Sequence, residues 1–235
     1  MTKYEALDHM QQAPNTHSEG QRFYYMPHHA VLKQQSTTTR TRVVFDASCQ
    51  SDSGVSPNDT LCVGPTVQQD LFSIVTRFCT HQAALTADKT KMYRQIRMDE
   101  RDINLQRIIW RENPSDPVKI FQLKTVTYGT SAASFLATRC QVQLADEEAN
   151  EFPRASRILN TDFYVDDLLS GADTVEDAIQ LREELRELLG RGGFPLRKWY
   201  SSNLAVHETI PGKLRNTQNL LRIDEKDNVK TLGLL

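Results

Sequence analysis

The most constraining feature of the sequence is a pair of adjacent aspartates, Asp166 and Asp167, set between two runs of β-forming residues at 163–165 and 168–170. A polar connection of only two residues between two such runs predicts a tight β-hairpin with both aspartates at its tip. At a turn, neighbouring side chains can point toward a shared position, and a divalent cation there would offset the repulsion between the two carboxylates. The alternative is that the pair is only a favourable turn sequence.

A third carboxylate, Asp88, ends a short apolar strand predicted at 83–87, where a central strand would meet solvent. Four basic residues follow it with no acid before position 99: Lys89, Lys91, Arg94 and Arg97. An acid at a strand end followed by basic residues is typical of a site that binds metal ions together with polyanionic ligands. The alternative is that Asp88 caps a helical turn and the basic residues form a solvated face.

Three carboxylates on neighbouring strand ends indicate a particular chemistry. They can hold two Mg²⁺ ions about 3.5–4 Å apart, which activate a hydroxyl and stabilise a leaving pyrophosphate during in-line phosphoryl transfer. The sequence contains no Walker motif, no Ser-His-Asp order and no clustered His and Cys ligands that would favour another chemistry. The neighbours His28 and His29 lack a nearby acidic or thiol partner. A glycosidase would need only two acids, about 5–9.5 Å apart, in a sugar cleft.

The remaining patterns predict an α+β fold, with strands and helices mixed around antiparallel hairpins. Residues 1–22 are polar and rich in turn formers, which predicts a flexible tail. Helices are predicted at 67–80, 131–150 and 174–190, the last capped by Thr174. Further strands are predicted at 31–33, 42–46, 108–110, 119–123, 157–165, 196–200 and 229–235.

Composition limits the class of protein. The 28 basic and 30 acidic residues give a net charge of −2, which excludes a uniformly basic nucleic-acid-binding surface but not local basic patches. No apolar stretch approaches the roughly 18 residues of a membrane span, and the first residues do not resemble a secretory signal. The four scattered cysteines match no metal-binding spacing. We therefore expect an intracellular, cytoplasmic protein that is not secreted and has no membrane partner.

Several short motifs follow one another in a fixed order, among them Leu85-Thr86-Ala87-Asp88, Thr127-Tyr128-Gly129-Thr130 and Tyr164-Val165-Asp166-Asp167. The others lie at 25–33, 42–48, 92–96, 134–138, 193–199 and 230–233. In this set the chain resembles the reverse transcriptases of BEL/Pao-class LTR retrotransposons. The resemblance implies a right-hand polymerase without a thumb, with fingers at about 23–82 and 99–127. A ferredoxin-like palm at about 83–98 and 128–235 would carry the Asp166-Asp167 hairpin.

The same resemblance implies an RNA-directed DNA polymerase, a nucleotidyltransferase that adds dNTPs to a primer 3′-hydroxyl. Asp88, Asp166 and Asp167 would be the catalytic ligands of two Mg²⁺ ions, for which Mn²⁺ can substitute. Lys198 would be the general acid for pyrophosphate. The residues implied to bind the nucleotide are Lys33, Arg42, Lys89 through its carbonyl, Tyr93 as the sugar gate and Gly129.

Four of these residues also have a plain structural reading. Arg42 would be a surface arginine, Tyr93 a core aromatic, Gly129 a turn glycine, and Lys198 a stem packed beside Trp199. The chain departs from the family pattern at Ser134, where proline is common, and at Lys89, where an aliphatic residue is common.

The implied partners are a primed RNA or DNA template, dNTPs and other regions of the same polyprotein. Those regions are capsid, protease, RNase H and integrase, and they would place the protein in virus-like particles. The family's thumb would follow residue 235. The alternative is a truncated or decayed retroelement fragment that folds and binds nucleic acid without catalysis.

Overall fold

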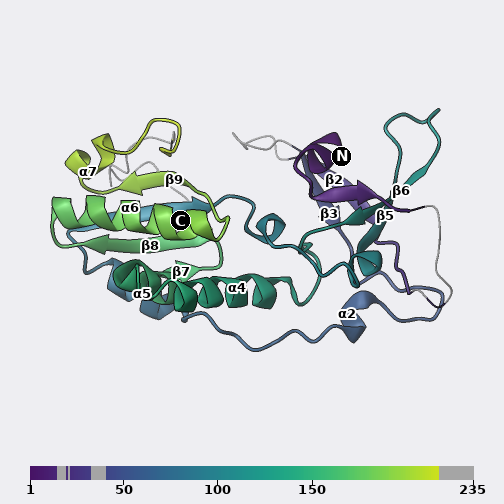
Figure 1. The fold of residues 1–235 in the computed structure, drawn as a ribbon, viewed down its shortest axis with the longest axis horizontal. Helices are drawn as coiled ribbons and strands as arrows, with labels where there is room; N and C mark the ends of the chain where they lie inside the picture. The colour runs from purple at the N-terminus through teal and green to yellow at the C-terminus, as the bar shows by residue number, and fades with distance from the viewer. Residues whose placement is uncertain (15–19, 21, 33–40, 217–235) are drawn as a thin grey trace. The chain divides into compact units, whose positions relative to one another are not determined.

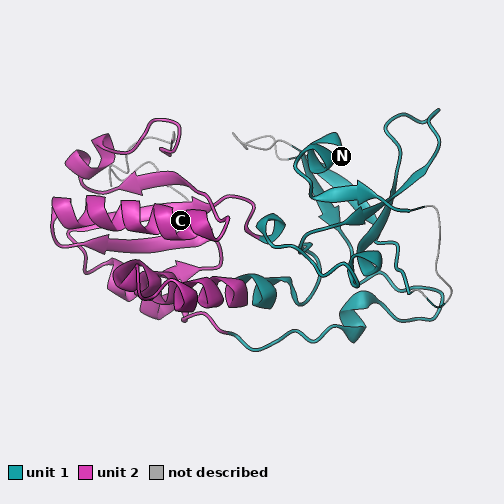
Figure 2. Cartoon of the chain, in the orientation of Figure 1, with its two compact units in different colours: residues 1–66, 93–137 teal, residues 67–92, 138–235 magenta. Residues whose placement is uncertain are grey.

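The computed structural model describes residues 1–14, 20, 22–32 and 41–216 (Figure 1). The chain forms two compact units (Figure 2). The first unit contains residues 1–66 and 93–137, and the second contains residues 67–92 and 138–235. Residues 67–82, predicted to belong to the fingers, group with the second unit, whereas 93–98 and 128–137, predicted to belong to the palm, group with the first. The predicted strand at 229–235 lies outside the described residues.

The first unit contains two antiparallel sheets. One has the order β1-β6-β5 and the other is the hairpin β2-β3. The elements of this unit are α1 (Thr2–Ala6), β1 (Met10–Gln12), β2 (His28–Leu32), β3 (Thr41–Phe45), α2 (Pro57–Thr60), η2 (Ile103–Gln106), β5 (Arg107–Trp110) and β6 (Lys119–Leu123). The strands predicted at 31–33 and 42–46 correspond to the antiparallel pair β2 and β3, with Lys33 outside the described residues, and the hairpin predicted at 108–123 is confirmed as β5 and β6. Met10, Phe45, Ile108 and Leu123 are buried in the core of this unit, and Trp110 packs against that core.

The prediction of a flexible tail is wrong for the first part of this segment, which contains α1 and β1. Strand β1 pairs with β6, with Met10 opposite Leu123, and Met10 is only 2% exposed. The error has a physical reason: a three-residue strand has too few positions to show alternation, and its partner lies more than a hundred residues along the chain.

The second unit contains a four-stranded antiparallel sheet in the order β7-β8-β4-β9. The strands are β4 (Ala83–Lys89), β7 (Phe163–Tyr164), β8 (Asp167–Ala172) and β9 (Leu196–Ser201). The helices are α3 (Leu71–Phe78), α5 (Pro153–Thr161), α6 (Val175–Arg191) and α7 (Leu204–Glu208). Helix α4 (Ala133–Glu147) begins in the first unit and ends in the second, and the 3₁₀ turn η1 (Met92–Gln95) spans the other boundary.

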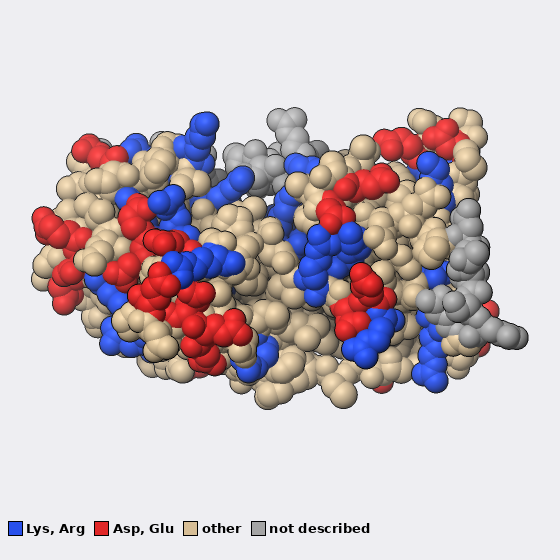
Figure 3. Space-filling view, viewed as in Figure 1, with Lys and Arg blue, Asp and Glu red and all other residues tan. Residues whose placement is uncertain are grey.

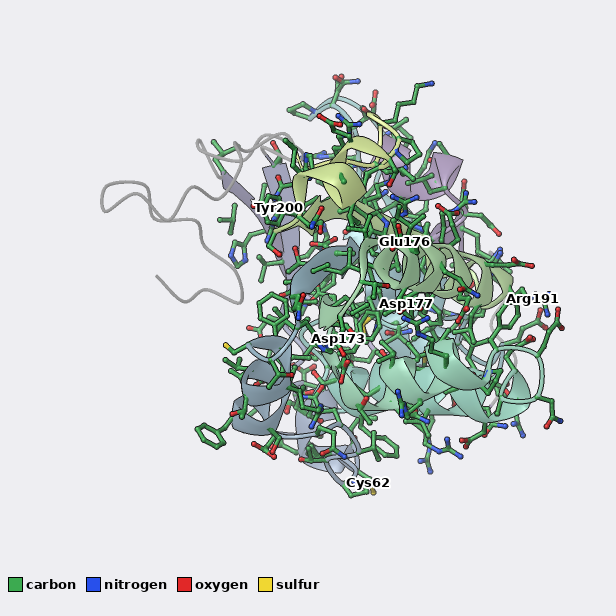
Figure 4. All side chains as sticks on the ribbon, turned by 90° about the vertical axis from the view of Figure 1, so that its left-hand side faces the viewer. Cys62, Asp173, Glu176, Asp177, Arg191 and Tyr200 are labelled. Carbon is green, nitrogen blue, oxygen red and sulfur yellow. The ribbon has the colours of Figure 1, made fainter. Side chains whose placement is uncertain are left out.

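Helix α6 packs along this sheet through a stripe of buried leucines at 181, 185 and 188. The predicted cap is confirmed, because the Thr174 hydroxyl accepts a hydrogen bond of 3.1 Å from the Asp177 amide. At the other end of the helix, Arg191 forms ion pairs with Glu148 and Glu151. Figure 4 labels Glu176 and Asp177 near the start of α6 and Arg191 at its end. The helices predicted at 67–80 and 131–150 are also present, as the shorter α3 and α4.

The strand predicted at 157–165 is wrong, because most of this segment is the helix α5. Pro153 occupies the first turn of the helix, a position that suits its fixed φ angle. Ala155, Ile158 and Leu159 are buried at helical spacing. A two-residue apolar run such as Ile158-Leu159 fits either structure, so the pattern alone did not separate them.

The molecule has a mixed α/β fold with antiparallel sheets, in agreement with the predicted α+β class. Within the described residues, no helix has both the length and the apolar character needed to cross a membrane. The four cysteines all lie in the described part and are free. Acidic and basic side chains are interspersed over the face shown in Figure 3, as expected from the nearly balanced charge.

Candidate active site on the four-stranded sheet

The predicted hairpin is present, with the paired aspartates at its tip. Strands β7 and β8 pair Tyr164 with Asp167, so Val165 and Asp166 form a two-residue turn. Val165 has a φ of +56°, a left-handed conformation that is rare for β-branched residues. Such strained positions persist only where surrounding contacts hold them, and they are concentrated at functional sites.

Asp88 belongs to the same end of the sheet. It lies in β4 directly opposite Asp167 of β8, and the amide of Lys89 donates a hydrogen bond of 2.9 Å to the Asp166 carbonyl. Asp88 is therefore part of a strand rather than the cap of a helix. The structure thus brings together the three carboxylates that the sequence singled out, from two neighbouring strands and the turn between β7 and β8.

Lys198 reaches this carboxylate group because of a bulge in β9. The register between β4 and β9 shifts between Thr86 and Asp88, and Lys198 has a φ of +54°. This irregularity lets Trp199 turn into the core, where it is 1% exposed, while the Lys198 ammonium lies 2.7 Å from a carboxylate oxygen of Asp88. Lys198 remains 48% exposed and makes an ion pair, so it is more than a stem packed beside Trp199.

The electrostatics of the cluster indicate a surplus of negative charge. Burial, together with the nearby charges of Asp166 and Asp88, raises the pKa of Asp167 to about 6. Burial, followed by the charge of Asp88, also raises the pKa of Asp166. Carboxyl groups that resist ionisation in this way are stabilised as anions by an added cation.

The donor set fits a divalent cation of the Mg²⁺ type, which prefers carboxylate oxygens. Across the described ranges, no three His, Cys, Asp or Glu side chains are already arranged as a complete metal centre. In this structure the Lys198 ammonium bonds the carboxylate of Asp88. A metal ion at this site would be held by Asp88, Asp166 and Asp167. To bind there, it would have to displace the Lys198 ammonium from the Asp88 carboxylate.

Lys89 is fully buried behind the turn, with 1% of its surface exposed. Its ammonium donates hydrogen bonds to the side-chain oxygen of Gln141 and, at 2.9 Å, to the carbonyl of Val165, and it lies 4.1 Å from the centre of the Phe163 ring. Burial lowers the pKa of Lys89 to about 7, against the opposing attraction of Asp166 and Asp167. The side chain of Lys89 points away from solvent, so only its backbone carbonyl stays a candidate ligand.

The basic residues after Asp88 do not form one exposed face. Arg94 is 4% exposed and stacks on the rings of three aromatic residues, Tyr4, Phe45 and Tyr128, at 4.9–5.1 Å. Arg97 bonds the carboxylate of Asp8. Lys89, Lys91, Arg94 and Arg97 therefore form neither a continuous phosphate-binding surface nor a solvated basic face, because Lys89 and Arg94 are both buried.

The other predicted nucleotide-binding residues belong to the first unit. Arg42 is exposed on β3, opposite Val31. Tyr93 is half-buried, and its hydroxyl lies 3.2 Å from that of Ser134, the residue that replaces the proline common in the family. Lys33 lies outside the described residues. The carboxylates, Lys89 and Lys198 belong to the second unit.

Gly129 has a structural role that accounts for its residue type. Its φ is +101°, and an added Cβ would lie 2.3 Å from the Phe45 carbonyl oxygen. We expect Gly129→Ala to lower the free energy of unfolding by about 2–4 kcal/mol in urea denaturation. Gly54 provides the control, because it has a φ of +75° but no heavy atom within 4 Å of an added Cβ. Gly54→Ala should cost only about 1 kcal/mol; equal losses in the two variants would contradict the steric explanation.

Sequence reasoning missed two glutamines that contact the turn. The side-chain oxygen of Gln68 accepts a hydrogen bond of 3.1 Å from the Val165 amide, and Gln141 accepts from Lys89. Gln141 lies on the buried side of α4. Neither residue belongs to a local motif, since the groups that it contacts are distant in sequence.

Of the three comparisons with known proteins, only the one with solved structures found similar chains. No protein-family model and no curated protein sequence matches the chain. Among solved structures, a mutant of the prototype foamy virus protease–reverse transcriptase is similar, with a TM-score of 0.61 and 17% identity over 83% of this chain and 22% of that chain. The foamy viral protease–reverse transcriptase dRH in complex with double-stranded DNA gives a TM-score of 0.61 and 16% identity over 82% of this chain and 28% of that one.

A third structure, the foamy viral enzyme in complex with an RNA/DNA hybrid, has a TM-score of 0.56 and 17% identity over 75% of this chain and 20% of that chain. The chain thus spans less than a third of each of these proteins. At these identities the likeness establishes architecture rather than activity. The chain has a reverse-transcriptase-like fold.

Proposed function

We propose that this chain is the fingers and palm of an RNA-directed DNA polymerase from a BEL/Pao-class LTR retrotransposon. The observation that carries the proposal is the meeting of Asp88, Asp166 and Asp167 at one end of an antiparallel sheet, beside a strained turn. In this proposal the second unit is the palm and the first unit is the fingers. The similarity of fold to foamy viral protease–reverse transcriptases supports it.

The chemistry follows from the carboxylates and the adjacent lysine. Two Mg²⁺ ions, for which Mn²⁺ can substitute, would supply the positive charge that activates a primer 3′-hydroxyl and neutralises the triphosphate of a dNTP. Asp88, Asp166 and Asp167 would hold these ions. Lys198, freed from Asp88, would carry at its Nζ atom the proton that the departing pyrophosphate takes up.

The residues of the first unit would bind the nucleotide. Arg42 is exposed and offers a planar guanidinium group that matches phosphate oxygens. Tyr93, with its hydroxyl beside that of Ser134, would exclude a ribose 2′-hydroxyl and so select deoxynucleotides. Gly129 would leave room beside the template base, in addition to its structural role. Lys33 is proposed as a weaker phosphate contact.

The proposed partners are a primed RNA or DNA template and dNTPs. Two of the similar foamy viral proteins are in complex with double-stranded DNA or an RNA/DNA hybrid. In a complete element, capsid, protease, RNase H and integrase regions would belong to the same polyprotein, and synthesis would take place in cytoplasmic virus-like particles.

The test is extension of oligo(dT) on poly(rA) with dTTP, in Mg²⁺ and in Mn²⁺. We expect incorporation by the wild-type chain and a loss of at least about a thousandfold in Asp166→Asn and in Asp167→Asn, because each removes a charge that holds the ions. The matched control is Asp173→Asn, which changes an exposed acid just beyond the other end of β8 and should leave the rate unchanged.

Equal incorporation by the wild-type chain and Asp166→Asn would contradict the proposed site. No incorporation by any variant, together with salt-dependent binding of the primer–template, would instead favour the non-catalytic retroelement fragment. Measuring binding and incorporation on the same preparations therefore separates the two functions.

A further inference from the structure

Three hydrogen bonds hold the backbone of the turn that carries Asp166. The Val165 amide donates to Gln68 at 3.1 Å, the Val165 carbonyl accepts from Lys89 at 2.9 Å, and the Asp166 carbonyl accepts from the Lys89 amide at 2.9 Å. These bonds engage both sides of the strained residue Val165. Lys89 supplies two of the three, one from its side chain and one from its backbone.

The Lys89 side chain is itself oriented by a chain of hydrogen bonds that leads to two helices. Its ammonium donates to the side-chain oxygen of Gln141 in α4, and the Gln141 amide nitrogen donates to the Leu159 carbonyl in α5 at 2.5 Å. Because that amide nitrogen is occupied by Leu159, the oxygen of Gln141 faces Lys89. The series Leu159, Gln141, Lys89 and Val165 thus connects the packed helices to the turn.

Packing alone does not explain a lysine at this position. Lys89 is buried beside the Phe163 ring, where an aliphatic residue would fill the space without desolvating an ammonium group. Both of its side-chain acceptors are neutral oxygens. An amine presents at least two N–H donors whether or not it is protonated, so both hydrogen bonds are retained in either state.

We propose that Lys89, oriented by Gln141, is a positioning residue that holds the Val165 carbonyl and thereby fixes the direction of the Asp166 and Asp167 carboxylates. Lys89 does not touch the reacting atoms. The assignment of those carboxylates as metal ligands rests on the proposed function, whereas the effect of Lys89 on the turn is independent of it.

The first test is Lys89→Met, which keeps the length of the side chain and removes its donors. We expect the amides at positions 89 and 165 to exchange hydrogen at least about tenfold faster, with the amides at 84–86 and 169–171 unchanged. We also expect Mn²⁺ to bind about tenfold more weakly, as measured by electron paramagnetic resonance without nucleotide or nucleic acid. Hydrogen exchange is measured without metal, so it gives an answer even if the chain has no polymerase activity.

The matched control is Arg182→Met, which removes another buried cation from the same unit, one bonded to Glu183 and Thr209. It should lower thermal stability without changing exchange at the turn or Mn²⁺ affinity. A second test variant, Gln141→Met, leaves Lys89 in place but removes the acceptor that orients it. It should speed hydrogen exchange at the turn and weaken Mn²⁺ binding, as Lys89→Met does. It therefore tests the proposal even if Lys89→Met does not fold.

Unchanged exchange at the turn in folded Lys89→Met and Gln141→Met would overturn the proposal. Faster exchange with unchanged Mn²⁺ affinity would also overturn it, because the lysine would then stabilise the hairpin without positioning its carboxylates. Loss of incorporation in Asp166→Asn is a separate result, so failure of this inference and failure of the proposed polymerase are distinguishable.

Discussion

Removing residues 1–12 should unfold the first unit or lower its free energy of unfolding by at least about 4 kcal/mol. These residues include strand β1, whose Met10 is buried opposite Leu123, and Tyr4, whose ring stacks on the buried Arg94. The Tyr4 hydroxyl also lies 2.6 Å from that of Tyr128, and burial raises the pKa of Tyr4 to about 12. Truncation would expose a guanidinium-containing aromatic core to water, and urea denaturation with limited proteolysis measures the result.

A matched pair of substitutions in β1 tests whether the buried Met10 side chain accounts for the stability that this strand contributes. Met10→Ala removes a buried side chain and should cost about 2–5 kcal/mol, whereas Gln12→Ala changes an exposed residue of the same strand and should cost less than about 0.5 kcal/mol. If the truncated chain were as stable as the full one, the first residues would be the dispensable tail that their composition predicts.

Lys198→Met should change metal binding and catalysis in opposite directions. The Lys198 ammonium lies 2.7 Å from the Asp88 carboxylate, so it occupies an oxygen that a metal ion would need. Its removal should tighten Mn²⁺ binding by about tenfold, since a competing cation within 4 Å shifts such equilibria by roughly this amount. If Lys198 is also the general acid, dTTP incorporation should fall by about a hundredfold or more.

Arg197→Met is the control for Lys198→Met. Arg197 is the exposed neighbour in β9 whose backbone lies opposite Asp88, and no ion pair with it is present among the described residues. Its replacement should leave Mn²⁺ affinity within about twofold of wild type, because a solvent-exposed charge contributes little. Weaker Mn²⁺ binding in Lys198→Met would show that the lysine supports the metal site instead of competing for it.

The elements that the sequence predicted correctly are those with dense local signals. The Asp166-Asp167 hairpin has a polar step between two β-forming runs, and α6 has both a Thr174 cap and a leucine stripe. Asp88 was placed at a strand end because it follows a short, mostly apolar run at 83–87, and it lies one residue before the end of β4. In each case the information lies within about fifteen residues of chain.

The features that could not be predicted from the sequence depend on contacts with residues that are distant along the chain. Strand β1 is specified by β6, and α5 by burial of a helical face that also fits a strand. Lys89 was read as part of a basic run, but its environment is set by Gln141 and by the Val165 carbonyl. A charged residue in a short window is indistinguishable from a solvated one until the fold supplies its neighbours. The proposed roles of Arg42, Tyr93 and Lys33 stay predictions.

The chain contains two tryptophans, and they are divided between the two units: Trp110 in β5 and Trp199 in β9. Each packs in its own unit, Trp110 against the core of the first and Trp199 buried within the second. Intrinsic tryptophan fluorescence can therefore report on the unfolding of each unit separately. A chain with Trp110→Phe reports only on the carboxylate-bearing unit, and one with Trp199→Phe only on the other, so the order in which they unfold can be recorded without any attached dye.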